Sequence, residues 1–175
     1  LSFLIVVVFW GAFEQAGGLM NIYAFEKTNR VISSINFEVP ATWFQSLNAG
    51  FIVLFAVAVG KFWAWWKSLG RESALLFQMA VGVIIMALGF AVMSEAALEF
   101  ERNGSSAMYY LVLAYLLHTL GELCTSPTAM ALITKLAPVK YASIMMGTYF
   151  ACTGFGNKLA AELGEWAQTA GEYEI

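Results

Sequence analysis

The stretch from Met108 to Leu136 is predominantly apolar, yet it carries the ionisable side chains of His118 and Glu122 in its middle. About 20 mostly apolar residues are enough to cross the hydrocarbon core of a bilayer as a helix, so this stretch is long enough to span a membrane. A charged side chain at that depth is costly unless it has a partner or faces a water-filled cavity. The stretch therefore predicts a membrane helix with a functional carboxylate, which makes transport of a solute the first hypothesis.

The spacing of polar residues in this stretch places them together. His118, Glu122 and Ser126 are four residues apart, so on a helix they share one face. Pro127 has no backbone N–H and leaves the carbonyl of Leu123 without its helical partner, which loosens the helix just after Glu122. A carboxylate beside a weakened turn of a membrane helix is a candidate functional site.

The composition of the whole chain agrees with a membrane protein. Hydrophobic residues make up 60% of the chain and charged residues 12%, with a mean hydropathy of +0.70. A typical soluble domain has about 25% charged residues. We therefore predict an all-α fold, a polytopic membrane helix bundle. Its expected crossings are residues 1–24, 43–66, 74–93, 108–136 and 142–163, and the chain after Glu165 is expected to be frayed.

Basic residues gather at one set of helix ends. These ends hold five positive and one negative residue, namely Lys61, Lys67, Arg71, Glu72, Lys135 and Lys140. The opposite ends are acidic overall. Because Lys and Arg concentrate in cytoplasmic loops, the basic ends are predicted to face the cytoplasm. The chain begins with Leu1, and its first apolar run lacks the basic flank and cleavage site of a signal peptide, so we expect Leu1 to lie within a longer gene product.

Four motifs stand in order along the chain. They are residues 9–15 (FWGAFEQ), 40–48 (PATWFQSLN), 121–127 (GELCTSP) with 134–138 (TKLAP), and 145–150 (MMGTYF) with 156–157 (GN). The set resembles helices 7, 8, 10 and 11 of the proton-dependent oligopeptide transporter family, a branch of the major facilitator superfamily. The resemblance implies that the chain is approximately helices 7 to 11, the C-terminal half of such a transporter, with the N-terminal half and the last helix absent.

The same resemblance implies a proton-coupled symporter of di- and tripeptides that works by alternating access between two six-helix halves. It would lie in the cell inner (plasma) membrane as a multi-pass protein. Its implied partners are short peptides, membrane lipid and the missing N-terminal half, with protons as the coupling ion. The resemblance implies no cofactor, no metal and no nucleic acid.

The resemblance also implies roles for individual side chains. Glu122 would face the amino group of the peptide and exchange a salt bridge with a lysine of the absent half. Asn48 would hydrogen-bond the peptide, and Ser126 would line the same cavity. Glu14 would be a second proton site, near the outer gate. The aromatic walls of the pocket would be Trp10, Phe13 and Tyr149.

Each candidate also has a purely structural interpretation. Glu122 can be a buried, protonated link between helices, and Glu14 can lie near a polar interface. For His118 the sequence favours a buried neutral histidine making one hydrogen bond over a proton relay. Asn48 and Ser126 can make interhelical hydrogen bonds worth about 0.6 kcal/mol each. The aromatic residues can serve packing alone.

Other classes of function fit the sequence less well. An intramembrane hydrolase needs a nucleophile–base pair, paired aspartates or a metal cluster, whereas the chain has a single His and no Asp. There is no basic run suited to nucleic acid. A channel does not explain carboxylates on two separate helices. A carrier of other small solutes or drugs from the same superfamily, and a structural membrane subunit, stay open as alternatives.

Overall fold

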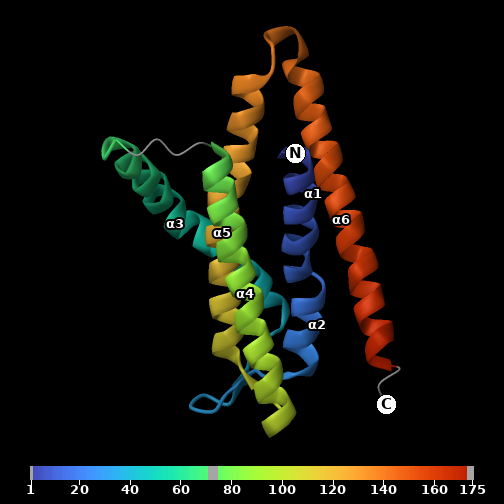
Figure 1. Cartoon of the computed structure of the whole chain (residues 1–175). Helices are drawn as coiled ribbons and strands as arrows, with labels where there is room; N and C mark the ends of the chain where they lie inside the picture. The colour runs from blue at the N-terminus through green and yellow to red at the C-terminus, as the bar shows by residue number, and fades with distance from the viewer. Residues whose placement is uncertain (1, 71–74, 173–175) are drawn as a thin grey trace.

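The computed structural model describes residues 2–70 and 75–172, and they form a bundle of long helices (Figure 1). In chain order the helical elements are α1 (Ser2–Phe13), η1 (Glu14–Ala16), α2 (Leu19–Glu26), α3 (Thr42–Ser68), α4 (Leu75–Asn103), α5 (Met108–Leu136), η2 (Val139–Tyr141) and α6 (Ala142–Glu172). The prediction of an all-α bundle is confirmed. Helix α4 packs along α5, α1 packs along α6, and α3 crosses α5. In Figure 1, α3 leans away from the bundle toward its C-terminal end.

The first apolar segment is not one continuous helix. Helix α1 ends at Phe13, a 3₁₀ turn follows, and α2 begins only after Gly17 and Gly18. Two successive glycines disfavour helix, and a 3₁₀ turn within a helical run often marks a functional hinge. Backbone carbonyls released by such a break need other donors at membrane depth. The break therefore places polar backbone groups in the middle of the bundle.

Glycines bring the helices of each pair into close contact. A Cβ added at Gly121 of α5 would lie 2.6 Å from the carbonyl oxygen of Gly82 on α4. Similarly, a Cβ at Gly156 of α6 would lie 2.8 Å from the carbonyl oxygen of Val7 on α1. In a membrane the lipid is as apolar as the side chains, so the hydrophobic effect does not drive helices together. Small residues allow helix backbones to approach closely and to gain van der Waals contacts instead. Pairs α4–α5 and α1–α6 are thus joined by close packing.

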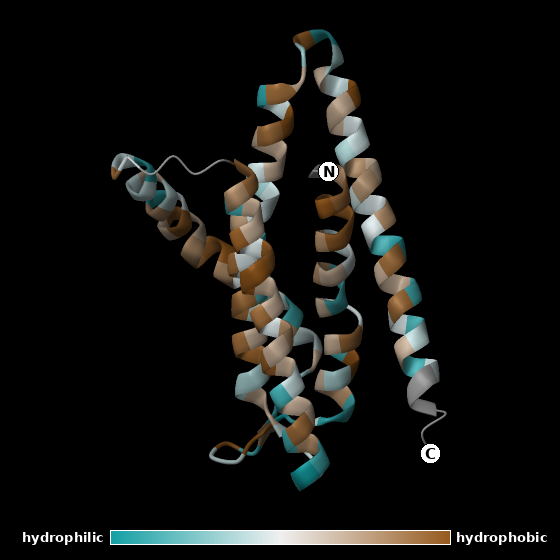
Figure 2. Cartoon of the chain, viewed as in Figure 1, coloured by the Kyte–Doolittle hydropathy of each residue, from teal (hydrophilic) through white to brown (hydrophobic). Residues whose placement is uncertain are grey.

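Within residues 2–70 and 75–172, three helical segments are long and apolar enough to cross a membrane by length and composition. They are Phe3–Glu26, Thr42–Ser68 and Leu75–Asn103. Helices α5 and α6, with 29 and 31 residues, also have the length of a crossing and carry more polar side chains. Figure 2 shows apolar residues along the helices and hydrophilic ones at the lower end of α4. The prediction of five crossings stays a prediction.

Helix ends differ from the sequence prediction in two places. Helix α4 does not end near residue 93 but continues through Glu95 and Glu99 to Asn103. Helix α6 continues to Glu172, so the expected fraying after Glu165 is wrong. Hydropathy indicates which residues lie within the membrane, but not where a helix ends. Charged residues such as Glu and Arg favour helix, so a helix can continue beyond its apolar part. Helix α5 has the predicted bounds and continues through Pro127.

The linker between α2 and α3 forms small strands. Strand β1 (Thr28–Asn29) pairs in parallel with β4 (Ser106–Ala107), and β2 (Val31–Ile32) pairs antiparallel with β3 (Phe37–Glu38). Arg30 forms an ion pair with Glu38 at 2.6 Å, beside this hairpin. These contacts tie the linker to the start of α5 at the end of the bundle opposite the α5–α6 turn (Figure 1).

We expect Gly121→Ala to destabilise the protein by about 1–3 kcal/mol, because the new methyl group overpacks the α4–α5 contact. The matched control is Gly60→Ala on α3, where an added Cβ meets nothing within 4 Å. That variant should keep or raise stability by about 0.4–1 kcal/mol. Unfolding of the purified protein in detergent measures both variants. Equal effects of the two substitutions would contradict the close packing of α4 and α5.

Candidate functional site

A hydrogen-bonded pair joins α3 to α5 where the two helices cross. The side-chain nitrogen of Asn48 donates to the Glu122 carboxylate at 2.9 Å and contacts the Thr119 hydroxyl oxygen at 3.1 Å. Thr119 is completely buried, and Glu122 is half-buried. The structure therefore brings together two of the side chains that the sequence singled out, from segments far apart in the chain.

This pair continues into a chain of hydrogen bonds along α5. Thr119 donates its hydroxyl to the carbonyl oxygen of Tyr115 at 2.7 Å. The buried Tyr115 hydroxyl donates in turn to the carbonyl oxygen of Ala16 at 2.6 Å, at the break of the first helix. Buried polar groups at membrane depth need such partners. The network connects Glu122 to the break.

Other polar contacts hold the break in place. Gln15 is buried and donates from its side-chain nitrogen to the carbonyl oxygen of Ala160 on α6 at 2.9 Å. Gln45 of α3 donates to the carbonyl oxygen of Gly17 at 3.2 Å. Through these bonds the 3₁₀ turn that carries Glu14 is attached to two other helices.

Glu14 lies between two spaces in the structure. It borders a cavity of about 150 Å³ between the break, α3 and α5, and a larger polar pocket of about 570 Å³ against α6. Asn48, the hydrogen-bond partner of Glu122, borders the smaller of the two spaces together with Glu14. Two half-buried carboxylates in one region can hold protons or an ammonium group, and repulsion between them favours binding of a positive charge. Among the described residues, no group of three His, Cys or acidic side chains is placed to hold a metal ion.

The predicted aromatic residues are divided between two places. Trp10 and Phe13 pack edge-to-face with ring centroids 5.5 Å apart, and Phe13 borders the cavity beside Glu14. Tyr149 is 2% exposed and lies in an apolar cluster with Val6, against which Trp10 also packs. Ser126 is half-buried, one helical turn beyond Glu122. Tyr149 therefore lies in an apolar cluster to which α1, α4, α5 and α6 all contribute.

His118 differs from the expectation of one hydrogen bond. Its side chain is 1% exposed, and neither ring nitrogen has a hydrogen-bond partner among the described residues. The ring instead packs on Phe90 of α4, with centroids 4.7 Å apart, and its Nε2–Cδ2 edge lies against Gly89. The missing side chain of Gly89 provides the space that the ring fills. The hydrogen bond expected for His118 is therefore not made within the described part of the chain, and its partner stays a prediction.

Sequence reasoning missed Thr119 and Tyr115. It selected residues at intervals of four, whereas the hydrogen-bonded side chains on α5 are Tyr115, Thr119 and Glu122, spaced four and then three residues apart. Both spacings keep side chains on one helical face. The sequence did contain this pattern, because Tyr115 and Thr119 are polar residues on the helical face that also carries Glu122.

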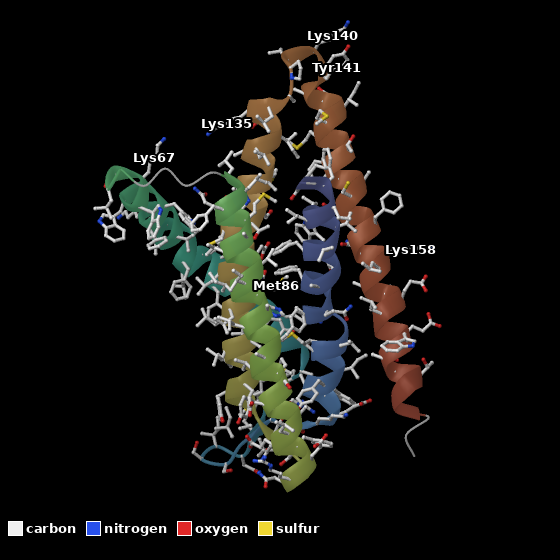
Figure 3. The ribbon with its side chains drawn as sticks, viewed as in Figure 1. Lys67, Met86, Lys135, Lys140, Tyr141 and Lys158 are labelled. Atoms are coloured by element: carbon white, nitrogen blue, oxygen red, sulfur yellow. The ribbon has the colours of Figure 1, made fainter. Side chains whose placement is uncertain are left out.

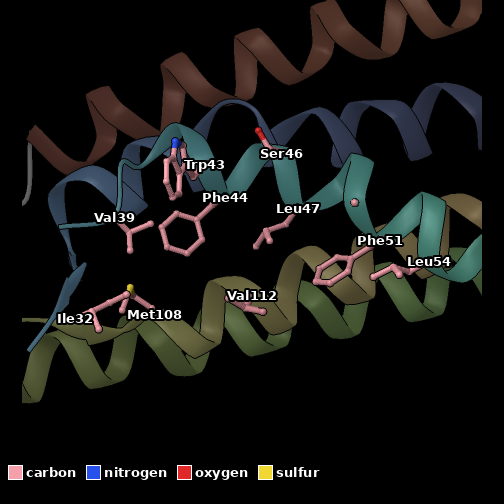
Figure 4. Close-up of a pocket in the computed structure, with 11 residues that line it drawn as sticks. Ile32, Val39, Trp43, Phe44, Ser46, Leu47, Phe51, Leu54, Met108 and Val112 are labelled. Atoms are coloured by element: carbon pink, nitrogen blue, oxygen red, sulfur yellow. The ribbon is translucent and has the colours of Figure 1, made fainter. Parts of the chain in front are cut away.

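A second pocket lies between α3, the β2–β3 hairpin and the start of α5 (Figure 4). Its volume is about 630 Å³, and its walls are apolar, with Trp43, Phe44, Leu47 and Phe51 from α3 on one side. Met108 and Val112 of α5 face them. None of the residues that line the pocket is charged, and Ser46 is the one polar side chain among them.

Comparison with known proteins identifies the family. The PTR2 model, described as the POT family, matches residues 1–171. The chain belongs to the POT family. The resemblance found in the four motifs is thereby confirmed at the level of the family. The position of the chain as helices 7 to 11 remains a prediction.

Several relatives of this POT family chain are named transporters rather than enzymes. The peptide transporter YePEPT of Yersinia enterocolitica is 38% identical over 89% of this chain and 30% of its own length. A di-/tripeptide transporter of Lactococcus lactis subsp. cremoris is 27% identical over 92% of this chain and 32% of its own. A crystal structure of the peptide transporter POT in complex with sulfate superposes with a TM-score of 0.81 at 29% identity, covering 94% of this chain and 32% of that one. The chain spans about a third of the length of these relatives.

We expect Asn48→Leu to destabilise the protein by about 1–3 kcal/mol, because Glu122 and the buried Thr119 lose their shared partner. The matched control is Gln45→Leu on the same helix, which removes an exposed hydrogen bond and should change stability by about 0.5 kcal/mol at most. Thermal unfolding of the purified protein in detergent compares the two. If Asn48→Leu is as mild as Gln45→Leu, the interhelical pair does not hold α3 on α5.

Proposed function

We propose that this chain forms helices 7 to 11 of a proton-coupled symporter of di- and tripeptides that works by alternating access. Membership of the POT family supports the proposal, as do the names of relatives described as a peptide transporter and a di-/tripeptide transporter. On this proposal the chain works with an N-terminal half of the same transporter and a last helix, surrounded by membrane lipid. Protons are the coupling ion, and no other cofactor is invoked.

The observation that carries the proposal is the Glu122 carboxylate held by Asn48, which borders the same cavity as Glu14. An ionised carboxylate in a low-dielectric site needs a compensating cation, and otherwise it takes up a proton. The ammonium group of a peptide or a lysine of the other half can supply that cation. Protonation of Glu122 neutralises its carboxylate, which then attracts neither the peptide ammonium group nor the lysine. Exchange among proton, lysine and peptide therefore couples proton uptake to opening of the site.

The other candidate residues take supporting roles in this proposal. Asn48 has a carbonyl oxygen in addition to the nitrogen bonded to Glu122, and its amide can rearrange to hydrogen-bond a peptide. Ser126 lies one turn from Glu122 and borders the same binding region. Glu14 is the second proton site, set at the break of the first helix. The aromatic walls are Trp10, Phe13 and Tyr149, with Tyr149 acting through its packing against Trp10.

We also propose an orientation in the cell inner (plasma) membrane as a multi-pass protein. Lys67, Lys135 and Lys140 lie at the same end of the bundle (Figure 3). Because basic residues concentrate on the cytoplasmic side, that end faces the cytoplasm. The break of the first helix, with Glu14, then lies toward the outer half of the membrane, and the strands lie outside.

The test is uptake of a labelled dipeptide by the full-length transporter in liposomes under an inward proton gradient. Wild type should accumulate the peptide. Glu122→Gln should lose accumulation by at least about tenfold, since an amide can neither carry the charge nor release a proton, and about 1.4 kcal/mol corresponds to that factor. Glu95→Gln, which removes the same charge from an exposed position on α4, should transport like wild type.

The outcomes separate the parts of the proposal. If wild type ignores peptides under this gradient, the substrate class is wrong and a carrier of another small solute or drug takes its place. If wild type accumulates peptide and Glu122→Gln does so equally well, the Asn48–Glu122 pair is a structural link between helices. Loss of uptake in Glu95→Gln would mean that the effect of Glu122→Gln is not specific to the site.

A further inference from the structure

The pocket of about 570 Å³ lies between the break of the first helix, the start of α3 and the C-terminal half of α6, and is called the α6 pocket below. Its volume is in the range of small-molecule binding sites. From α6 it is lined by one face of the helix, which carries the polar side chains of Asn157, Glu165 and Gln168. None of the described residues that line the pocket is basic. The lining therefore carries negative charge with no positive charge to balance it.

Gln15 presents an unpaired oxygen to this pocket. The side chain is 7% exposed, and its nitrogen donates to the carbonyl oxygen of Ala160 on α6 at 2.9 Å. That bond fixes the orientation of the amide, because a carbonyl oxygen can only accept. The oxygen, Oε1, lies near Gly18 and Gly164, where an added Cβ would be 3.8 and 3.9 Å away, and both glycines line the pocket. No hydrogen bond reaches Oε1 within the described part of the chain, and the atom is not sealed from solvent.

Other acceptors surround this oxygen in the pocket lining. Glu14 borders the pocket from the 3₁₀ turn, and Glu165 borders it from α6. Gln45 uses its side-chain nitrogen to bind the carbonyl oxygen of Gly17, which leaves its own oxygen as an acceptor. Acceptors combined with negative charge favour a cationic group that donates several hydrogen bonds, namely an ammonium or a guanidinium group.

The α6 pocket adjoins the central site. Three residues, Glu14, Gly17 and Gln45, line both this pocket and the smaller cavity of about 150 Å³. That cavity is also bordered by Asn48, which donates to the Glu122 carboxylate. A peptide held at Glu122 can therefore direct one of its side chains toward the α6 pocket.

We propose that the α6 pocket is a subsite for a cationic side chain of the transported peptide, with Gln15 and Glu165 receiving its ammonium or guanidinium group. This inference rests on the proposed function and names the class of side chain that the pocket selects. Glu165 supplies negative charge from the exposed wall of the pocket. The buried Oε1 of Gln15 supplies an acceptor in a fixed position. A neutral side chain of the same length gains neither interaction.

The experiment compares two dipeptides as substrates of the full-length transporter reconstituted in liposomes. They are alanyl-lysine and alanyl-norleucine, which has the same carbon chain without the ammonium group. KM and maximal rate of proton-driven uptake are measured for each. Glu165→Gln removes the charge of the pocket wall with little change of shape. The matched control is Glu162→Gln, an exposed carboxylate of the same helix that does not line the pocket.

We expect Glu165→Gln to raise the KM for alanyl-lysine about threefold, the size of effect of a partly exposed charge pair, with no change for alanyl-norleucine. Glu162→Gln should change neither KM. If Glu165→Gln leaves both values unchanged, the inference is overturned. It is also overturned if both peptides are affected equally, because Glu165 then acts on transport in general rather than on the side chain.

A second variant covers the Gln15 oxygen without removing a hydrogen bond. Gly164→Leu adds bulk from α6 beside Oε1, whereas Gly154→Leu, on the same helix, places its Cβ where nothing lies within 4 Å. Gly164→Leu should raise the KM for alanyl-lysine at least about threefold and leave that for alanyl-norleucine unchanged, and Gly154→Leu should change neither. Unchanged uptake of alanyl-lysine by Gly164→Leu would contradict the subsite.

The wild-type protein separates failure of this inference from failure of the proposed function. If wild type takes up neither dipeptide under the proton gradient, the proposed function fails. If it takes up alanyl-norleucine but not alanyl-lysine, the proposed function stands and the cationic subsite is overturned.

Discussion

A carboxylate inside a membrane helix has to receive hydrogen bonds from its neighbours, and here Asn48 donates one to Glu122 where α3 crosses α5. An unsatisfied polar group within a membrane bundle is costly, so the position of α3 and the state of Glu122 depend on each other. Other buried polar groups of α5 are paired in the same way. Thr119 accepts a hydrogen bond from Asn48 and donates one to the Tyr115 carbonyl, and the Tyr115 hydroxyl donates to the carbonyl of Ala16. The helix break and the carboxylate site are therefore one hydrogen-bonded unit.

The bundle uses two different means of holding helices together. Within the pairs α4–α5 and α1–α6, glycines allow the backbones to approach, and dispersion contacts over a long interface join them. Between α3, α5 and the helix break, hydrogen bonds among a few polar side chains and freed carbonyls are added to an apolar cluster that includes Met20, Phe44 and Leu111. A hydrogen bond between side chains can be replaced by a hydrogen bond to a ligand, or lost on protonation, while the helices stay packed. The site accordingly lies where exchangeable hydrogen bonds join these elements in addition to their apolar packing.

Much of this arrangement was readable from the chain. The bounds of α5 follow from its apolar pattern, and the motifs predicted the family to which the chain belongs. The ends of α4 and α6 were not readable, because charged residues that leave the membrane still favour helix. For His118 the sequence predicted a hydrogen bond, but the space left by Gly89 lets the ring pack instead. Thr119 was not predicted as a site residue because α5 contains several threonines with similar sequence surroundings. Only the position of Asn48 in the folded protein distinguishes Thr119 from the others.

The sequence by itself determined that the chain is a bundle of membrane-type helices with Glu14 and Glu122 within its apolar segments, because hydropathy and the cost of burying charge act residue by residue. Tertiary structure alone decided which side chains meet. Asn48 reaches Glu122 across 74 positions of the chain, and Tyr115 reaches Ala16 across 99, through a crossing and a break that no local pattern specifies. Only the packing of helices brings such groups to within hydrogen-bond distance, and it also leaves the small cavity that Glu14 and Asn48 border.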